Sequence, residues 1–158
     1  MDRDHYAAAA RERADALYAG VLTPHRSCGI AIAETFGLPT PSYQALRKGG
    51  ITGEGPCGAI ATGVIALGEL LGDPSPTGGV RPVLRDAVPR FRSAIATKID
   101  HAVDTACNVR TAPLGAFTGP ARATYCTHLA AVVAETVAEV LWDVGHVVPI
   151  PPAPWLRS

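Results

Sequence analysis

The chain has no excess of charge of either sign, since 14 Lys and Arg residues are matched by 14 Asp and Glu residues among its 158 positions. Proteins that bind nucleic acids or anionic membranes depend on clustered basic residues, so the balance argues against both classes of partner. Aromatic residues make up only 6% of the chain and charged residues 18%, while apolar residues reach 47%. This composition is typical of a globular chain rather than a disordered one, and the length fits a single domain.

Long apolar runs and a secretion signal are also missing. The longest uncharged apolar stretch extends from Cys57 to Gly68, which is too short to cross a bilayer. The chain begins Met1-Asp2-Arg3, and the alanine run that follows is soon interrupted by charges, unlike the apolar region of a signal peptide. We therefore expect a cytoplasmic protein without membrane attachment. In that compartment cysteines are thiols, metal ligands or redox groups rather than structural disulfides.

The hydrophobic pattern predicts helices and no convincing strand. Apolar residues recur at steps of three and four, and glycines and prolines separate the repeating segments. The segment from Cys57 to Gly72 is apolar on nearly all sides, so it should be the buried central helix, and its four glycines indicate points of close helix approach. We predict an all-α, single-domain bundle of about five or six helices, which cover residues 4–19, 24–36, 57–72, 80–107 and 120–144, with one or two further turns over 41–48.

The end of the chain differs in character from the rest. Residues 148–158 are rich in proline and should form an extended arm, whereas residues 1–147 should form the helical four-cysteine domain. Trp155 lies in this arm, and a tryptophan there usually packs on its own domain or on a sister subunit. A homo-oligomer formed through the arm is therefore one expectation.

Four cysteines carry the most information: Cys28, Cys57, Cys107 and Cys126. They form no C-x-x-C pair, which excludes the usual zinc-ribbon, bacterial ferredoxin and thioredoxin motifs. Each lies on a different predicted helix or helix end. Four thiols from four elements can converge on one site, as metal ligands do in other helical bundles. The alternative is that they are four small buried hydrophobic side chains.

Cys57 differs from the other three because it follows a glycine-rich loop over residues 49–56 and should occupy the first turn of the central helix. Unpaired backbone N–H groups and the helix dipole at that position stabilise a thiolate and lower the pKa of the thiol. The glycines on both sides are expected to leave the sulfur accessible. Cys57 is therefore a candidate nucleophile or metal ligand, although simple packing against a neighbouring helix would also explain it.

The same loop contains the segment Gly53-Glu54-Gly55-Pro56-Cys57-Gly58, which matches G-x-G-x-x-G. The dinucleotide-binding motif requires an apolar strand before it, and none precedes this segment. Gly55 and Gly58 are instead candidates for an anion-binding nest of backbone N–H groups. His25 lies one helical turn before Cys28 and is a candidate additional metal ligand or proton donor, although lone histidines are more often hydrogen-bonded boundary residues.

The order of the cysteines and the sequence around Cys57 together resemble a known family. Cys57-Gly58-Ala59 opens an apolar segment that ends in Ala66-Leu67-Gly68, with the glycine-rich lead-in before it. Cys28 stands near the start of an early helix, Cys107 ends the predicted long helix, and Cys126 opens the last one. In these respects residues 24–142 resemble the small bacterial redox-active proteins that are defined by four cysteines and a CGAxxG motif.

The resemblance implies a redox protein. A related domain occurs in multihaem split-Soret cytochromes, where it is associated with an iron–sulfur cluster, and by analogy it suggests a cluster site here. The chain has no C-x-x-C-H motif, so it attaches no c-type haem itself. Two departures distinguish it from the family: Thr62 stands where the family has glycine, with Gly63 one position late, and the loop between the third and fourth cysteines is short.

Three hypotheses follow. The leading one is that the four cysteines bind an iron–sulfur cluster or another metal, for electron transfer or redox sensing with a partner protein or small molecule. The second is a metal-free thiol–disulfide oxidoreductase in which Cys57 attacks and another cysteine resolves the disulfide. The third is a non-catalytic helical module that binds a small ligand and uses its cysteines for packing.

Overall fold

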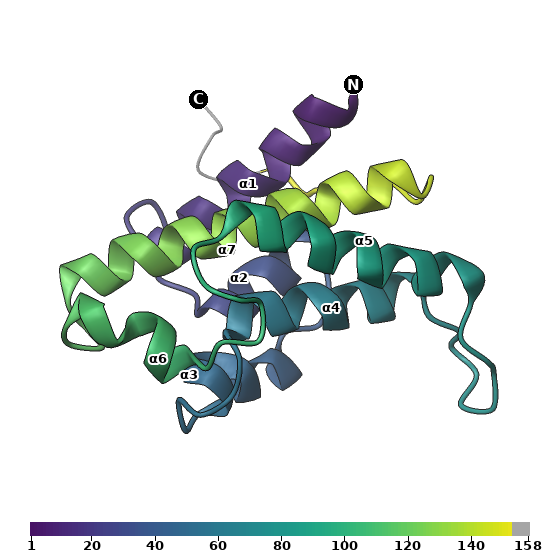
Figure 1. Cartoon of the computed structure of the whole chain (residues 1–158). Helices are drawn as coiled ribbons and strands as arrows, with labels where there is room; N and C mark the ends of the chain where they lie inside the picture. Colours follow the sequence, from purple (N-terminus) through teal and green to yellow (C-terminus); the bar gives the residue numbers. More distant parts are fainter. Residues whose placement is uncertain (153–158) are drawn as a thin grey trace.

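The computed structural model describes residues 1–152, and this part of the chain is entirely helical and loop in structure. It contains no β-strand, which confirms the all-α prediction. The elements in chain order are α1 (Arg3–Ala19), α2 (Cys28–Thr35), η1 (Pro41–Leu46), α3 (Arg47–Gly50), α4 (Gly58–Leu71), α5 (Pro82–Lys98), α6 (Cys107–Thr111), η2 (Ala112–Leu114) and α7 (Pro120–Asp143) (Figure 1).

The most extensive helix–helix packing in the bundle is between α1 and α7, which lie side by side (Figure 1). Half of the buried residues of α1 are alanines, including Ala10 and Ala14, which are both fully buried. Small side chains allow two helices to pack closely. Arg3 then donates hydrogen bonds of 2.8 and 3.0 Å to the carboxylate of Asp143, so that the start of α1 is joined to the end of α7.

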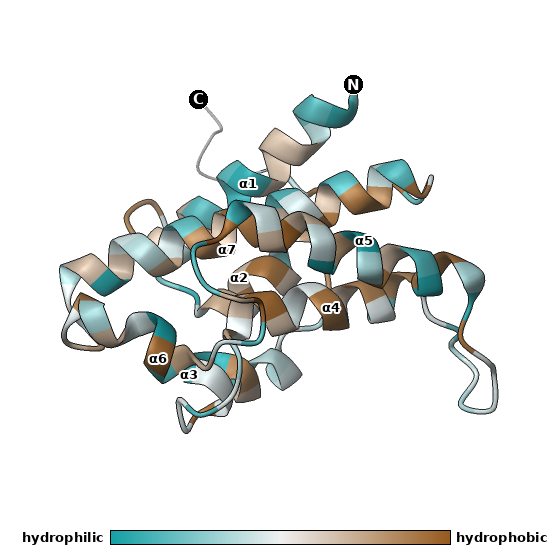
Figure 2. Ribbon diagram, in the orientation of Figure 1, coloured by the Kyte–Doolittle hydropathy of each residue, from teal (hydrophilic) through white to brown (hydrophobic). Residues whose placement is uncertain are grey.

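Helix α4 is the central apolar element, as expected. Figure 2 shows that hydrophobic residues dominate its surface, and it packs against α2, α5 and α7. A Cβ at Gly63 would overlap the ring of Phe91 on α5, which confirms a close helix approach at that glycine. At Gly68 a Cβ would meet nothing within 4 Å. The interpretation of every α4 glycine as a contact point is therefore wrong at Gly68.

Two helix boundaries differ from the prediction, and both changes place a cysteine at a helix start. The second helix begins at Cys28 rather than near residue 24. The helix expected over residues 80–107 ends at Lys98, after passing through Pro89 without restarting, and Cys107 begins the separate helix α6. Ile99 and Val103, between these helices, still pack against the core. The apolar spacing in this segment therefore predicted contact with the core correctly, but it did not predict the secondary structure.

The first residues of the predicted arm pack on α1. The hydroxyl of Tyr6 donates to the carbonyl of Val148 at 2.9 Å, and Arg13 donates to the carbonyl of Pro151 at 3.0 Å. Trp155, on which the expectation of a homo-oligomer was based, lies outside the described residues. None of the described helices is both long and apolar enough to cross a membrane.

Candidate functional site

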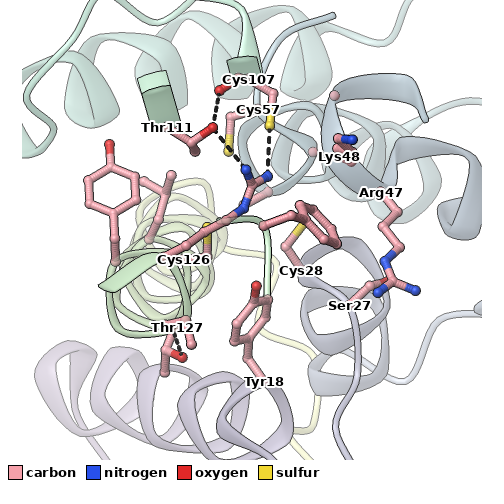
Figure 3. Close-up of a pocket in the computed structure, with 18 of the residues that line it drawn as sticks. Tyr18, Ser27, Cys28, Arg47, Lys48, Cys57, Cys107, Thr111, Cys126 and Thr127 are labelled. Carbon is pink, nitrogen blue, oxygen red and sulfur yellow. Dashed lines mark hydrogen bonds between the residues drawn. The ribbon is translucent and has the colours of Figure 1, made fainter. Parts of the chain in front are cut away.

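All four cysteines line a single cavity of about 280 Å³. Cys28 is the first residue of α2, Cys57 is the N-cap of α4, Cys107 is the first residue of α6, and Cys126 lies in the second turn of α7. Figure 3 shows the four side chains around this space. The structure thus brings together residues that are separated by up to 98 positions along the chain, and all four are free thiols.

The positions of Cys57 and Cys107 are fixed by backbone pairing between their preceding segments. The N–H of Cys107 donates to the carbonyl of Gly55 at 2.8 Å, and the N–H of Asn108 donates to the carbonyl of Gly53 at 2.9 Å. Pro56 and Ala106 form an isolated antiparallel bridge beside them. The glycine-rich loop is therefore joined directly to the start of α6, and this pairing positions Cys57 and Cys107 in the wall of the same cavity.

Two glycines leave the space that the cysteines need. Gly49 has a φ of 58°, in the left-handed region where glycine is favoured, and a Cβ there would lie 2.5 Å from the Cβ of Cys107. At Gly58 a Cβ would lie 3.0 Å from the sulfur of Cys28 and would overlap the carbonyl of Leu46. Any larger residue at either position would push a cysteine away from the cavity.

The prediction of a low pKa at Cys57 is wrong. Burial raises the pKa of this thiol to about 11, and this outweighs the backbone N–H groups of Ala59 and Ile60, which act in the expected direction. The thiol is also only 8% exposed, so the flanking glycines do not leave it accessible. Burial, followed by the neighbouring Cys57 and Cys126 thiols, raises the pKa of Cys28 to about 12. Both thiols are therefore protonated at neutral pH.

The anion-binding nest predicted around Gly55 and Gly58 stays a prediction, although the Gly55 N–H already has a partner. The N–H groups of Gly53 and Gly55 donate to the carbonyls of Lys48 and Gly49 within the loop, at 2.7 and 3.0 Å. Gly58 lines the cavity but Gly55 does not. The contribution of Gly55 is the carbonyl that orients Cys107, which is a structural role.

Two buried arginines form part of the cavity wall, and the sequence analysis missed both. Arg110 is 2% exposed and Arg122 is 7% exposed. Arg122 donates from Nη1 to the hydroxyl of Thr111 at 3.0 Å and from Nη2 to the sulfur of Cys107 at 3.4 Å, as the dashed lines in Figure 3 mark. The signal was present in the spacing, since Arg110 follows one cysteine by three residues and Arg122 precedes Cys126 by four, which places each pair on one helical face.

Further cations surround the mouth of the cavity. Arg47, Lys48 and Arg122 all lie over the ring of Phe117, at 5.7, 5.1 and 4.2 Å from the ring centre. Among the described residues, no Asp or Glu lines the cavity. Although the whole chain has no net charge, this cavity is therefore positively charged.

Two further residues singled out in the sequence, His25 and Thr62, differ in whether they line the cavity. His25 lines the cavity, but its Nδ1 contacts the carbonyl of Tyr18 and its ring stacks edge-on against the Tyr18 ring, with 4.7 Å between centres. Thr62 is fully buried and donates from its hydroxyl to the carbonyl of Gly58 at 2.6 Å. Thr62 thus supports the first turn of α4 and is not part of the cavity wall.

In residues 1–152, no group of three or more His, Cys, Asp or Glu side chains is arranged so that it could hold a metal ion. The scan against family models, the search of curated proteins and the search of solved structures gave no match to this chain. The resemblance to the four-cysteine family therefore stays a prediction based on the order and setting of the cysteines.

Proposed function

We propose that Cys28, Cys57, Cys107 and Cys126 bind an iron–sulfur cluster, and that the protein serves electron transfer or redox sensing. The observation that carries this proposal is the presence of all four cysteines in the wall of one cavity. Four cysteine thiolates are the common ligand set of both two-iron and four-iron clusters. When bound, such a cluster supplies one-electron redox chemistry.

The charge of the cavity supports an anionic occupant. Removing a cation from water is costly unless an opposite charge compensates for it. Arg110 has a carboxylate partner in Asp100, with 3.3 Å between Nη1 and the carboxylate oxygen, whereas Arg122 makes its hydrogen bonds to a hydroxyl and a sulfur. An iron–sulfur cluster with four thiolates carries net negative charge, and Arg122 is placed to compensate for part of it.

The four cysteines share one cavity but, among the described residues, do not form the close group that a single tetrahedral ion requires. Tetrahedral zinc with Zn–S bonds of about 2.3 Å requires its four sulfurs to lie roughly 3.8 Å apart, and no such grouping exists among the described side chains. In a cluster the thiolates bind different iron atoms, so they lie farther apart around a larger cavity. Cysteines from four different helices around one cavity fit this requirement better.

The dithiol hypothesis has less support. An attacking cysteine needs an accessible thiolate, but Cys57 is buried and its pKa is raised to about 11. Metal coordination, in contrast, deprotonates a thiol directly and needs no solvent access. A module that uses its cysteines only for packing would not require two buried arginines beside them.

Serine substitution tests the proposal. Each of the variants C28S, C57S, C107S and C126S should bind less iron and acid-labile sulfide after anaerobic reconstitution than the unchanged chain. Ala123→Ser is the matched control, because Ala123 also lines the cavity but offers no ligand. A dithiol enzyme would instead depend on two cysteines only and would lose two free thiols on oxidation. Full reconstitution of all four serine variants would refute the proposal.

A further inference from the structure

We infer that the mouth of the cavity is a binding site for a small organic anion that carries a carboxylate or phosphate group. The inference rests on the proposed function in one respect, because the ligand would lie beside the metal centre. It extends that function by naming the chemical class of the molecule that approaches the centre.

The first observation is the gathering of cations at the mouth. Arg47 and Lys48 are exposed and belong to one turn, Phe117 comes from the loop before α7, and Arg122 lies beneath on α7 itself. Within the described part of the chain, Arg47 and Lys48 form no ion pair with a carboxylate. Arginine and lysine are the side chains that recognise carboxylates and phosphates. Three such groups lie around one ring, all in the cavity lining, and their positive charge attracts an anion.

The second observation concerns buried polar atoms that have no partner. Arg110 is 98% buried, lines the cavity, and has no hydrogen-bond partner for its Nε among the described residues. The hydroxyl of Ser27, which also lines the cavity, is buried and has no partner there either. Buried polar groups are nearly always hydrogen-bonded, so two such donors in one cavity wall indicate that an acceptor belongs inside.

The backbone at the mouth is also strained. Lys48 adopts the left-handed conformation, with φ 52° and ψ 48°, and Ile51 has φ 73° and ψ −38°. A β-branched residue adopts positive φ rarely and at a cost, and strain of this kind is concentrated at ligand sites. The strained turn places the Lys48 side chain over Phe117. This supports a ligand-binding role for the turn.

The size of the cavity limits the ligand. A volume of about 280 Å³ lies at the lower end of the range for small-molecule sites, and the sulfurs occupy part of its wall. Arg122 contacts both the Cys107 sulfur and the Phe117 ring, so a ligand held at the mouth would lie next to the cysteine group. A small molecule fits this geometry, whereas a protein surface could contact only the rim.

The test compares benzoate with benzamide, which have nearly the same shape but differ in charge. Binding is followed by backbone amide NMR shifts in the reduced, metal-free chain. We expect benzoate to shift the amides around Lys48 and Phe117 and benzamide to leave them in place. The double variant R47Q/K48Q should weaken benzoate binding at least tenfold. The control R81Q/R85Q removes the same charge from the exposed start of α5 and should bind as the unchanged chain does.

Equal binding of benzoate and benzamide would overturn the inference, and so would unaltered benzoate binding by R47Q/K48Q. Both side chains are exposed, so the helix content of the variant should equal that of the unchanged chain. The result is independent of the cluster, because this measurement uses metal-free protein. Benzoate binding in a chain that cannot be reconstituted with iron would refute the cluster alone. Reconstitution without benzoate binding would refute the anion site alone.

Discussion

Arg122 is the residue that links the cysteines to the mouth of the cavity, since it contacts the Cys107 sulfur and the ring of Phe117. A positive charge beside a cluster stabilises its reduced form, which carries one more negative charge. Arg122→Gln should therefore lower the reduction potential of the reconstituted protein by roughly 100 to 200 mV, as expected for one charge about 4 to 8 Å away at an effective dielectric constant of about 20.

Redox titration of reconstituted protein measures this shift. Arg122→Lys, which keeps the charge, should restore most of the potential, and Arg85→Gln on the exposed face of α5 should leave it unchanged. A purely structural role for Arg122 would give the opposite pattern, with equal losses in the Gln and Lys variants. An unchanged or raised potential in Arg122→Gln would contradict the proposed electrostatic role.

Thr62 replaces the glycine expected from the family resemblance, and its packing explains how the chain accommodates it. A Cβ at Gly29 would lie 2.8 Å from the Thr62 hydroxyl oxygen and 3.1 Å from the carbonyl of Tyr43. Gly29→Ala should therefore destabilise the chain by about 1–3 kcal/mol, the usual cost of overpacking. The same change should cost less in a Thr62→Ala background. Urea unfolding of the two single variants and the double variant measures this coupling, and strict additivity would contradict it.

At the residue scale, the sequence predicted the candidate ligands but not their environment. Cysteines are few and chemically distinctive, so Cys28 and Cys107 could be selected without a structure. Arg110 and Arg122 are spaced to share a helical face with a cysteine, but their burial could not be predicted, because arginine is ordinarily exposed and burial depends on contacts from other elements. The pKa of Cys57 was predicted in the wrong direction for the same reason. The helix N-terminus is visible in the sequence, whereas the burial that outweighs it is not.

At the scale of elements, the two α4 glycines Gly63 and Gly68 form a matched pair. Gly63→Ala should destabilise the chain by about 1–3 kcal/mol, because the new Cβ would overlap the buried ring of Phe91. Gly68→Ala meets open space and should stabilise the chain by up to about 1 kcal/mol through helix propensity. Thermal or urea unfolding separates the two outcomes. Stabilisation by both changes would show that α4 and α5 do not pack as described.

The helices themselves were largely predictable, but the starts of α2 and α6 were not. Glycine, proline and apolar spacing are local signals, and they placed α1, α4 and α7 almost correctly. The start of α6 depends on backbone hydrogen bonds from Cys107 and Asn108 to the glycine-rich loop. These groups lie about fifty residues apart in the sequence, and no local pattern encodes their pairing. The wrong boundaries of α2 and α6 matter for function, because the predicted helices did not place Cys28 and Cys107 at helix starts.

At the scale of the whole molecule, the bundle brings parts of four helices together around one cavity. The long pair α1 and α7 forms a frame, α4 provides the apolar centre, and the cysteines enter from α2, α4, α6 and α7. The hydrophobic pattern of the sequence correctly indicated an all-α fold. The sequence has equal numbers of acidic and basic residues, and it could not reveal that several cations, but no Asp or Glu of the described residues, line the cysteine cavity. That separation arises only from the fold.

The central claim is that the cavity binds an iron–sulfur cluster. The most direct measurement is the iron and acid-labile sulfide content per chain after purification without oxygen, with a visible absorption spectrum of the same sample. We expect iron and sulfide in equal amounts, together with broad visible absorption. Zinc without sulfide, or a colourless protein that takes up no iron on anaerobic reconstitution, would contradict the claim.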